Sequence, residues 1–333
     1  MLDVGCGRGA LLLSAARRLS RPDHHAHSNM EAILLFVDQK RFAIMNVAER
    51  ATMNLAETYG IVSQSIVAIS LKLLPTMSAP PDVPEIIGTG FVVEEGLIAT
   101  NDHVVRIGAK VPNFPGKVES DWPIEATLFH LTPDQGMVMI SMRVLGAFTV
   151  ETFHVPGAYY GPKSPDIGFL HVDMRGLPRL EIAQDEETVK PGVKVATTGF
   201  PMGTDALKAP GYVHQLTPTL QEGIVSAVLP FPCKTPHAFM LNMMTQGGAS
   251  GSPIFLHDSP KVIGVVYAGL TEKYRTKFQG LSLEYPVPTN FTYCVPAHYL
   301  RTALDNIRSK PELALPPDSP VLAEALKHCL QKG

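Results

Sequence analysis

Short runs of β-branched and apolar residues recur from residue 65 to residue 295, and glycine and proline residues separate them. Examples are Ser65–Leu71, Leu97–Thr100, Ile167–Val172 and Val262–Tyr267. Such runs indicate strands, and many of them in one region favour an antiparallel barrel or sandwich. The 27 glycines and 29 prolines among 333 residues fit this interpretation, because each connection between strands needs turn residues. The chain is therefore predicted to be mainly all-β.

The chain divides into three parts. Residues 1–60 have the mixed pattern of a short α/β segment, and residues 61–308 form the β-rich domain. Helical spacing of apolar residues predicts a helix at Ala297–Ile307, at the end of that domain. Residues 309–333 are predicted to be a C-terminal tail with room for one short helix, Val321–Leu330.

Composition excludes several classes of protein. The chain has 28 Lys and Arg residues and 31 Asp and Glu residues, which gives a net charge of −3. This charge removes the electrostatic argument for nucleic-acid binding. Cys6, Cys233, Cys294 and Cys329 contain no C-x-x-C pair, so we expect neither a zinc site nor a disulfide framework. The sequence begins without the pattern of a secretory signal and has no apolar run of about 18 residues, so no membrane span is expected. We therefore expect an intracellular, cytoplasmic protein without metal or cofactor, and leave its oligomeric state open.

Three local patterns of the β-rich region belong together chemically. The first is Gly88-Thr89-Gly90-Phe91, followed by a second strand and Thr100-Asn101-Asp102-His103, which places a histidine just past a strand end. The second is Asp166 directly before the alternating apolar run Ile167–Val172. The third is the glycine-rich segment Gly247-Gly248-Ala249-Ser250-Gly251-Ser252 before the strand Ile254-Phe255.

Acyl transfer explains why these residue types would be combined. A serine hydroxyl is a weak nucleophile, so an imidazole must take its proton and later donate it to the leaving group. A carboxylate holds that imidazole in the right tautomer. We assign His103 as general base and acid, Asp166 as the orienting carboxylate and Ser250 as nucleophile, with the N–H groups of Gly248 and Ser250 as the oxyanion hole. Asp173 and Asp134 are rival carboxylates, disfavoured because the alternating strand follows Asp166.

The order His…Asp…Ser, in these sequence contexts, resembles the chymotrypsin-like (trypsin-like) serine proteases. The likeness is closer to HtrA/Deg-type and other bacterial-style trypsin-like peptidase domains, without a PDZ domain. Gly199-Phe200-Pro201-Met202-Gly203 and Glu222-Gly223-Ile224-Val225-Ser226 are similar to further segments of that group. The resemblance covers about residues 61–305.

The resemblance implies a serine endopeptidase with two six-stranded antiparallel β-barrels, at about residues 61–175 and 178–296, followed by the C-terminal helix. Its substrate would be a peptide or protein, and Tyr267, Ala268 and Gly269 would pair with the substrate backbone. Met244, six residues before the nucleophile, would occupy the floor of the specificity pocket. Because Met244 is not acidic, an apolar side chain before the scissile bond is expected rather than Arg or Lys.

Two alternatives stay open. A catalytically inactive homologue could use the same cleft as a peptide-binding module. In addition, Leu2-Asp3-Val4-Gly5-Cys6-Gly7-Arg8-Gly9 resembles the first motif of S-adenosylmethionine-dependent methyltransferases, with Asp38 in place to bind the ribose. About 60 residues are too few for the repeated βα units of such a domain, which favours a fragment without that function.

Overall fold

The computed structural model describes residues 53–71, 86–109, 123–132, 136–150, 165–184, 189–203, 217–233, 235–278, 281–308 and 310–332. The methyltransferase-like motif, Asp38, Cys6 and Asp134 lie outside the described residues. Within the described part of the chain, none of the helices is long and apolar enough to cross a membrane.

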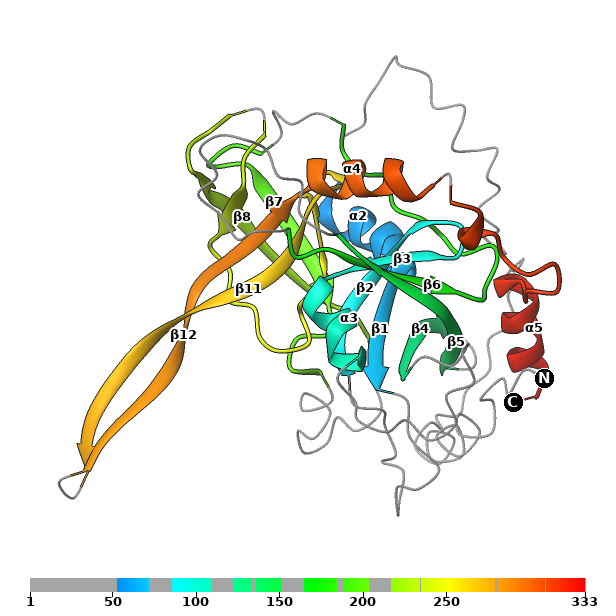
Figure 1. The fold of residues 1–333 in the computed structure, drawn as a ribbon, viewed down its shortest axis with the longest axis horizontal. Coiled ribbons are helices and arrows are strands. Elements are labelled where there is room, and N and C mark those ends of the chain that lie inside the picture. The colour runs from blue at the N-terminus through cyan, green and yellow to red at the C-terminus, as the bar shows by residue number, and fades with distance from the viewer. Residues whose placement is uncertain are drawn as a thin grey trace, which may run out of the picture.

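The first of two closed barrels contains six strands in the order β1-β2-β3-β6-β5-β4 (Figure 1). Neighbouring strands are antiparallel throughout. The strands are β1 (Ile66–Leu71), β2 (Ile86–Glu94), β3 (Leu97–Thr100), β4 (Ile124–Thr132), β5 (Gly136–Thr149) and β6 (Gly168–Val172).

The second barrel is also closed, in the order β10-β11-β12-β9-β8-β7. Together the two barrels confirm the predicted all-β fold with two six-stranded antiparallel barrels. The strands are β7 (Lys194–Gly199), β8 (Thr219–Leu229), β9 (Ala238–Leu241), β10 (Pro253–Leu256), β11 (Ser259–Phe278) and β12 (Leu281–Pro296).

A shared apolar core joins the barrels. Phe91 and Phe169 of the first barrel and Phe255 of the second are fully buried in one hydrophobic cluster. The rings of Phe129 and Phe200 meet within that cluster, with centroids 5.5 Å apart. Burial of aromatic side chains from both barrels fixes how their facing sides meet, and this junction is where the candidate site lies.

Helix α2 (Leu55–Val62) precedes the first strand, and the boundary predicted between residues 60 and 61 falls inside it. Asn54 and Glu57 form a capping box, because each side chain accepts a hydrogen bond from the backbone N–H of the other. The Tyr59 hydroxyl donates to the Pro218 carbonyl at 2.6 Å, which ties this helix to the segment before β8.

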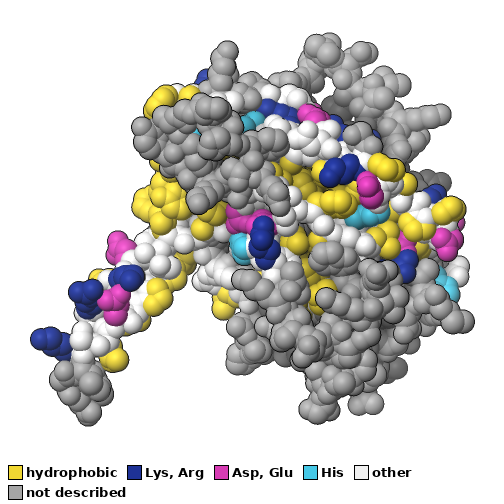
Figure 2. Space-filling view, viewed as in Figure 1, with side chains coloured by type: hydrophobic (Ala, Val, Ile, Leu, Met, Phe, Trp, Pro, Cys, Tyr) yellow, Lys and Arg dark blue, Asp and Glu magenta, His cyan; other side chains and the backbone are white. Residues whose placement is uncertain are grey.

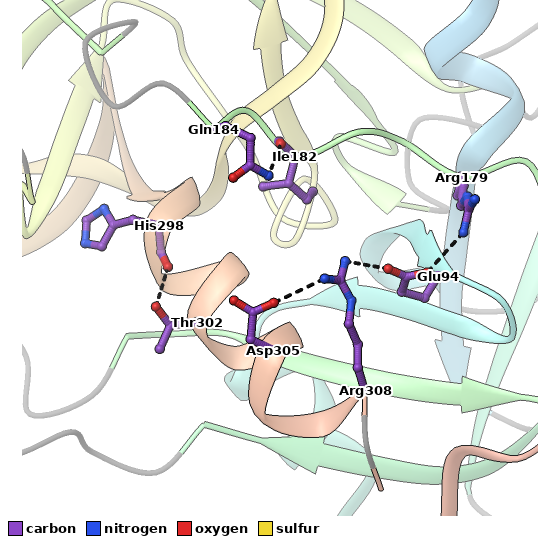
Figure 3. A network of polar contacts seen from close by, with 8 residues as sticks. All are labelled: Glu94, Arg179, Ile182, Gln184, His298, Thr302, Asp305 and Arg308. Carbon is purple, nitrogen blue, oxygen red and sulfur yellow. Dashed lines mark hydrogen bonds and ion pairs between the residues drawn. The ribbon is translucent and has the colours of Figure 1, made fainter. Parts of the chain in front are cut away.

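Helix α4 (Ala297–Ile307) has the bounds that the apolar spacing predicted. It follows β12 and crosses over to the first barrel, where Arg308 bonds to Glu94 of β2 (Figure 3). Arg308 also donates to Asp305, and Arg179 donates to the second oxygen of Glu94 at 3.2 Å. Glu94 therefore connects the C-terminal helix, the first barrel and the segment between the barrels.

The outer parts of β11 and β12 form a two-stranded arm that stands away from the barrels (Figure 1). Tyr274 and Tyr285 pair across it, with ring centroids 6.2 Å apart and exposed fractions of 55% and 47%. Arg275 and Lys273 both form ion pairs with Glu284. The register places these three residues on the face of the ribbon opposite to the two tyrosines. Figure 2 shows hydrophobic and charged side chains side by side along this arm.

The segment predicted to be a tail packs on the first barrel. Helix α5 (Leu322–Lys332) nearly coincides with the short helix predicted at Val321–Leu330. Its residue Leu322 is buried in the core of the first barrel. Backbone hydrogen bonds link Arg175 to the same region, since its N–H donates to Pro320 and its carbonyl accepts from Leu322. The C-terminal residues 310–332 are thus part of the folded domain.

Candidate active site

His103 and Asp166 meet where two adjacent strands end. Helix α3 (Asp102–Ala109) begins directly after β3 and carries His103, while Asp166 lies just before β6, the hydrogen-bonded neighbour of β3. His103 Nδ1 lies 2.6 Å from Asp166 Oδ2, and the His103 backbone N–H donates to Oδ1 at 3.0 Å. The Asn101 amide donates to the Asp166 carbonyl at 2.7 Å. Asp166 is thus held against the helix that positions the imidazole.

The rival carboxylate Asp173 is occupied elsewhere. Arg143 binds its Oδ2 at 2.6 Å, and the Ser319 hydroxyl donates to its Oδ1 at 2.6 Å. His171, on β6, is buried, and burial lowers the pKa of its imidazole. Neither residue contributes to the pair that His103 and Asp166 form.

Ser250 lies on the loop between β9 and β10, which two glycines with positive φ shape. Gly248 and Gly251 both have a φ of 88°, a region that L side chains rarely adopt. A Cβ on Gly248 would also meet Phe200 O and, at 2.8 Å, Gly203 N. A Cβ on Gly251 would meet Thr89 O and Thr100 Oγ1. Only glycine fits at these two positions while the serine between them keeps its place.

The backbone N–H groups of residues 248–252 fall into two sets. Those of Ala249, Gly251 and Ser252 donate to carbonyls at 3.1, 2.9 and 3.0 Å. Those of Gly248 and Ser250 have no acceptor among the described residues. The two N–H groups predicted to form the oxyanion hole are therefore the two that this part of the loop leaves without a protein acceptor.

Gly88 of β2 lies next to both the Ser250 backbone and the helix that carries His103. A Cβ on Gly88 would meet Val104, the residue after His103, at 2.7 Å and the Ser250 carbonyl at 3.3 Å. No hydrogen bond joins the Ser250 hydroxyl to the imidazole in the described structure. Catalytic hydrogen bonds are often long before substrate binds, and the His103 side chain is 44% exposed.

A cleft of about 320 Å³ opens beside Ser250. Ala268 and Gly269, two of the three residues predicted to pair with substrate, line it, together with Thr245, Gln246, Leu270 and Pro288 among others. The lining residues carry no charged side chain. The third residue, Tyr267, is not in the lining, and its ring stacks on Tyr293 with centroids 6.0 Å apart.

Met244 does not line the cleft. Its side chain is 39% exposed, and its carbonyl accepts a hydrogen bond from Gln221 at 3.1 Å. Thr245 and Gln246, the next two residues, line the cleft instead. Their side chains are neutral, so the cleft has no acidic group here, as expected. Met244 itself is not among the residues that line it.

Two residues that the sequence analysis did not single out contact the candidate site. Asn101 binds the Asp166 backbone, and fully buried Thr89 binds the backbone of the Ser250 loop. A sequence signal existed for Thr89, since a polar residue between two glycines interrupts an otherwise apolar strand. Among the described residues, no group of histidines, cysteines and carboxylates could hold a metal ion.

The chain belongs to the trypsin-like peptidase domain family, whose match spans residues 88–265, more than half of the 333 residues. This confirms the predicted resemblance to the chymotrypsin-like serine proteases. Solved structures with a similar fold include the HtrA-type protease AlgW with a decapeptide, at 14% identity and a TM-score of 0.45, covering 78% of this chain and 68% of that one. Another is an inactive mutant form of Rv3671c from M. tuberculosis, at 17% identity and a TM-score of 0.43, covering 76% and 91%. A comparison with curated proteins gives no match.

Proposed function

We propose that this protein is a serine endopeptidase that hydrolyses peptide bonds through an acyl-enzyme on Ser250. The observation that carries the proposal is the 2.6 Å contact between His103 Nδ1 and Asp166 Oδ2, at the junction that also holds the Ser250 loop. A carboxylate on Nδ1 keeps the proton there and leaves Nε2 as the basic nitrogen. The exposed imidazole can then receive the proton of a serine hydroxyl when substrate is bound.

The reaction would follow from these placements. Ser250 Oγ attacks the scissile carbonyl while His103 Nε2 takes its proton, and the carbonyl oxygen becomes an oxyanion bound by the N–H groups of Gly248 and Ser250. His103 then donates that proton to the leaving amine, which leaves an ester on Ser250. A water, deprotonated by the same imidazole, hydrolyses the ester and restores the serine.

The cleft favours substrates with neutral side chains. A peptide would lie along Ala268 and Gly269, and the side chain before the scissile bond would enter the cavity lined by Thr245, Gln246 and Leu270. Burying a Lys or Arg there would leave its charge without a partner among the lining residues. Peptides with Leu, Val or Ala before the scissile bond should therefore be cleaved faster than matched peptides with Lys or Arg.

Labelling by a fluorophosphonate probe tests the proposal, because the probe phosphonylates an activated serine. We expect labelling of the wild-type protein and none of Ser250→Ala. Ser252→Ala is the matched control, since its buried hydroxyl, two residues away, has no hydrogen-bond partner in the described structure. This control should label like the wild type. A folded wild-type protein that does not label would overturn the endopeptidase proposal.

The alternative function is a peptide-binding module without catalysis. It is kept because no hydrogen bond joins Ser250 to His103 within the described residues. A protein that binds neutral extended peptides but neither labels nor cleaves them would establish it. An intracellular location also remains our proposal, and the described Cys233 and Cys294 are both free thiols.

A further inference from the structure

We propose that Thr89 is a positioning residue that holds the Ser250 loop from the first barrel, an inference that rests on the proposed function. Thr89 lies on β2, and its side chain is fully buried. Ser250 lies on the loop between β9 and β10 of the second barrel. One residue of one barrel therefore sets the backbone geometry of the loop that carries the nucleophile in the other.

Thr89 donates hydrogen bonds to two carbonyls of that loop. Its hydroxyl donates to the Gly248 carbonyl at 2.7 Å, and its backbone N–H donates to the Ser250 carbonyl at 2.8 Å. Among residues 248–252, these are the two whose N–H groups have no acceptor in the described part of the chain. Thr89 thus binds the oxygens of the two residues whose nitrogens would bind the oxyanion.

Because peptide bonds are planar, these two contacts also restrict the orientation of the Ser250 N–H. The Gly248 carbonyl belongs to the peptide plane between Gly248 and Ala249, and the Ser250 carbonyl to the plane between Ser250 and Gly251. Each plane is rigid, so a hydrogen bond to its oxygen fixes the orientation of the whole unit. The plane between them carries the Ser250 N–H, and anchoring its neighbours on both sides restricts the direction in which that donor points.

Thr89 is itself fixed by contacts on its remaining polar atoms. Its hydroxyl accepts the Phe200 N–H at 3.0 Å, from the residue after β7. Its carbonyl accepts the Thr100 hydroxyl at 2.7 Å, at the end of the strand that leads to Asn101 and His103. The same residue is therefore connected to the strand that delivers the imidazole and to the loop that carries the nucleophile.

Serine would preserve these contacts, whereas valine would break them. Serine keeps a hydroxyl that can donate to Gly248 and accept from Phe200. Valine has nearly the volume of threonine but can do neither, so the Gly248 carbonyl and the Phe200 N–H lose their partner. Comparing the two substitutions separates the hydroxyl from the packing of the side chain.

The first measurement is the second-order rate of fluorophosphonate labelling at a temperature where all variants are folded. We expect Thr89→Val to label about 10- to 100-fold more slowly than wild type, because a misdirected oxyanion donor costs factors of this order. Thr89→Ser should stay within about threefold of the wild-type rate, since it keeps the hydrogen bonds. Thr127→Val removes another buried threonine hydroxyl, on β4, whose hydrogen-bond partner is Ser141 of β5, and should stay within about twofold of the wild-type rate.

The second measurement is amide hydrogen exchange of residues 246–252, which needs no catalytic activity. Thr89→Val should raise exchange there relative to both Thr89→Ser and Thr127→Val. Thr89→Ala serves both measurements should Thr89→Val fail to fold. A wild-type protein that does not label would count against the endopeptidase alone, and exchange would then decide the role of Thr89. The inference is wrong if exchange of the loop is unchanged in Thr89→Val, or if Thr127→Val slows labelling as much.

Discussion

Asp166 binds His103 at two points: one carboxylate oxygen contacts Nδ1 at 2.6 Å, and the other accepts the backbone N–H at 3.0 Å. The two contacts fix the imidazole and the helix that carries it relative to one side chain. Since Nδ1 must donate to the carboxylate, Nε2 is left without a proton and can act as a base. Asp166 therefore controls the tautomer of the His103 imidazole.

Replacing Asp166 with Asn should therefore impair catalysis much more than substrate binding. The amide of Asn can donate to Nδ1, which favours the tautomer with its proton on Nε2 and removes the base. We expect kcat to fall by about 10⁴-fold with KM changed much less, as for a loss of the correct tautomer. Steady-state hydrolysis of a peptide with Leu before the scissile bond measures both constants. A kcat within tenfold of wild type would show that the carboxylate does not orient the base.

Gly248→Ala should disrupt the Ser250 loop. The added Cβ would meet Phe200 O and Gly203 N in addition to the strain of a φ of 88°. We expect kcat to fall by about 100-fold or more, since the displaced N–H is one of the two proposed oxyanion donors. Peptide hydrolysis and fluorophosphonate labelling both measure this effect.

Gly192→Ala is the matched control for backbone strain. Gly192 has a φ of 91°, but a Cβ there would meet no atom within 4 Å. The substitution should lower the free energy of unfolding by about 1 kcal/mol and leave kcat unchanged. Equal losses of kcat in both variants would mean that strain, and not displacement of the loop, impairs the enzyme.

The pairing of His103 with Asp166 could be predicted because local sequence determines each residue's place at a strand end. The strands that carry them are neighbours in the barrel, with Thr100 opposite Gly168 in the register. The role of Asp173 was harder to see, since Arg143 and Ser319 reach it from distant parts of the chain. The contact between Thr89 and the Ser250 loop also depends on how the two barrels pack, which no local pattern encodes.

The arm could not be predicted from its sequence. The strand expected at Val262–Tyr267 continues to Phe278, although Glu272, Lys273 and Arg275 give this stretch the composition of a solvated loop. Pro286 on the partner strand likewise argues against a strand, because proline cannot donate to the ladder. Pairing with β12 and the alternation of faces outweigh these local preferences.

The stability of the fold should fall as the pH is lowered from 6.5 towards 4. Burial, together with the charges of Arg301 and His237, lowers the pKa of His298 to about 4. Below pH 6.5 the unfolded chain takes up a proton on His298 that the folded protein binds only near pH 4, so protons favour unfolding throughout this interval. Because the side chain is partly exposed, we expect a loss of about 2 kcal/mol rather than the full conversion of the pKa difference.

Urea unfolding of wild type and His298→Gln at several pH values measures this contribution. The variant should lose about 2 kcal/mol less than wild type between pH 6.5 and pH 4, because glutamine does not titrate. Groups that do not interact with His298 contribute equally to both curves, so the difference reports His298 together with its interaction with His237. Parallel curves for the two proteins would contradict the assigned pKa.

The last prediction concerns helix α5, which lies in the segment predicted to be a tail. Leu322 is 7% exposed and packs into the core of the first barrel with Met174 and Leu177. Leu322→Ala should therefore lower the free energy of unfolding by about 2–3 kcal/mol through lost burial and the cavity left behind. His328→Ala, at an exposed position of the same helix, should change it by less than about 0.5 kcal/mol. Urea denaturation measures both values, and equal small changes would mean that α5 is dispensable for the stability of the barrel.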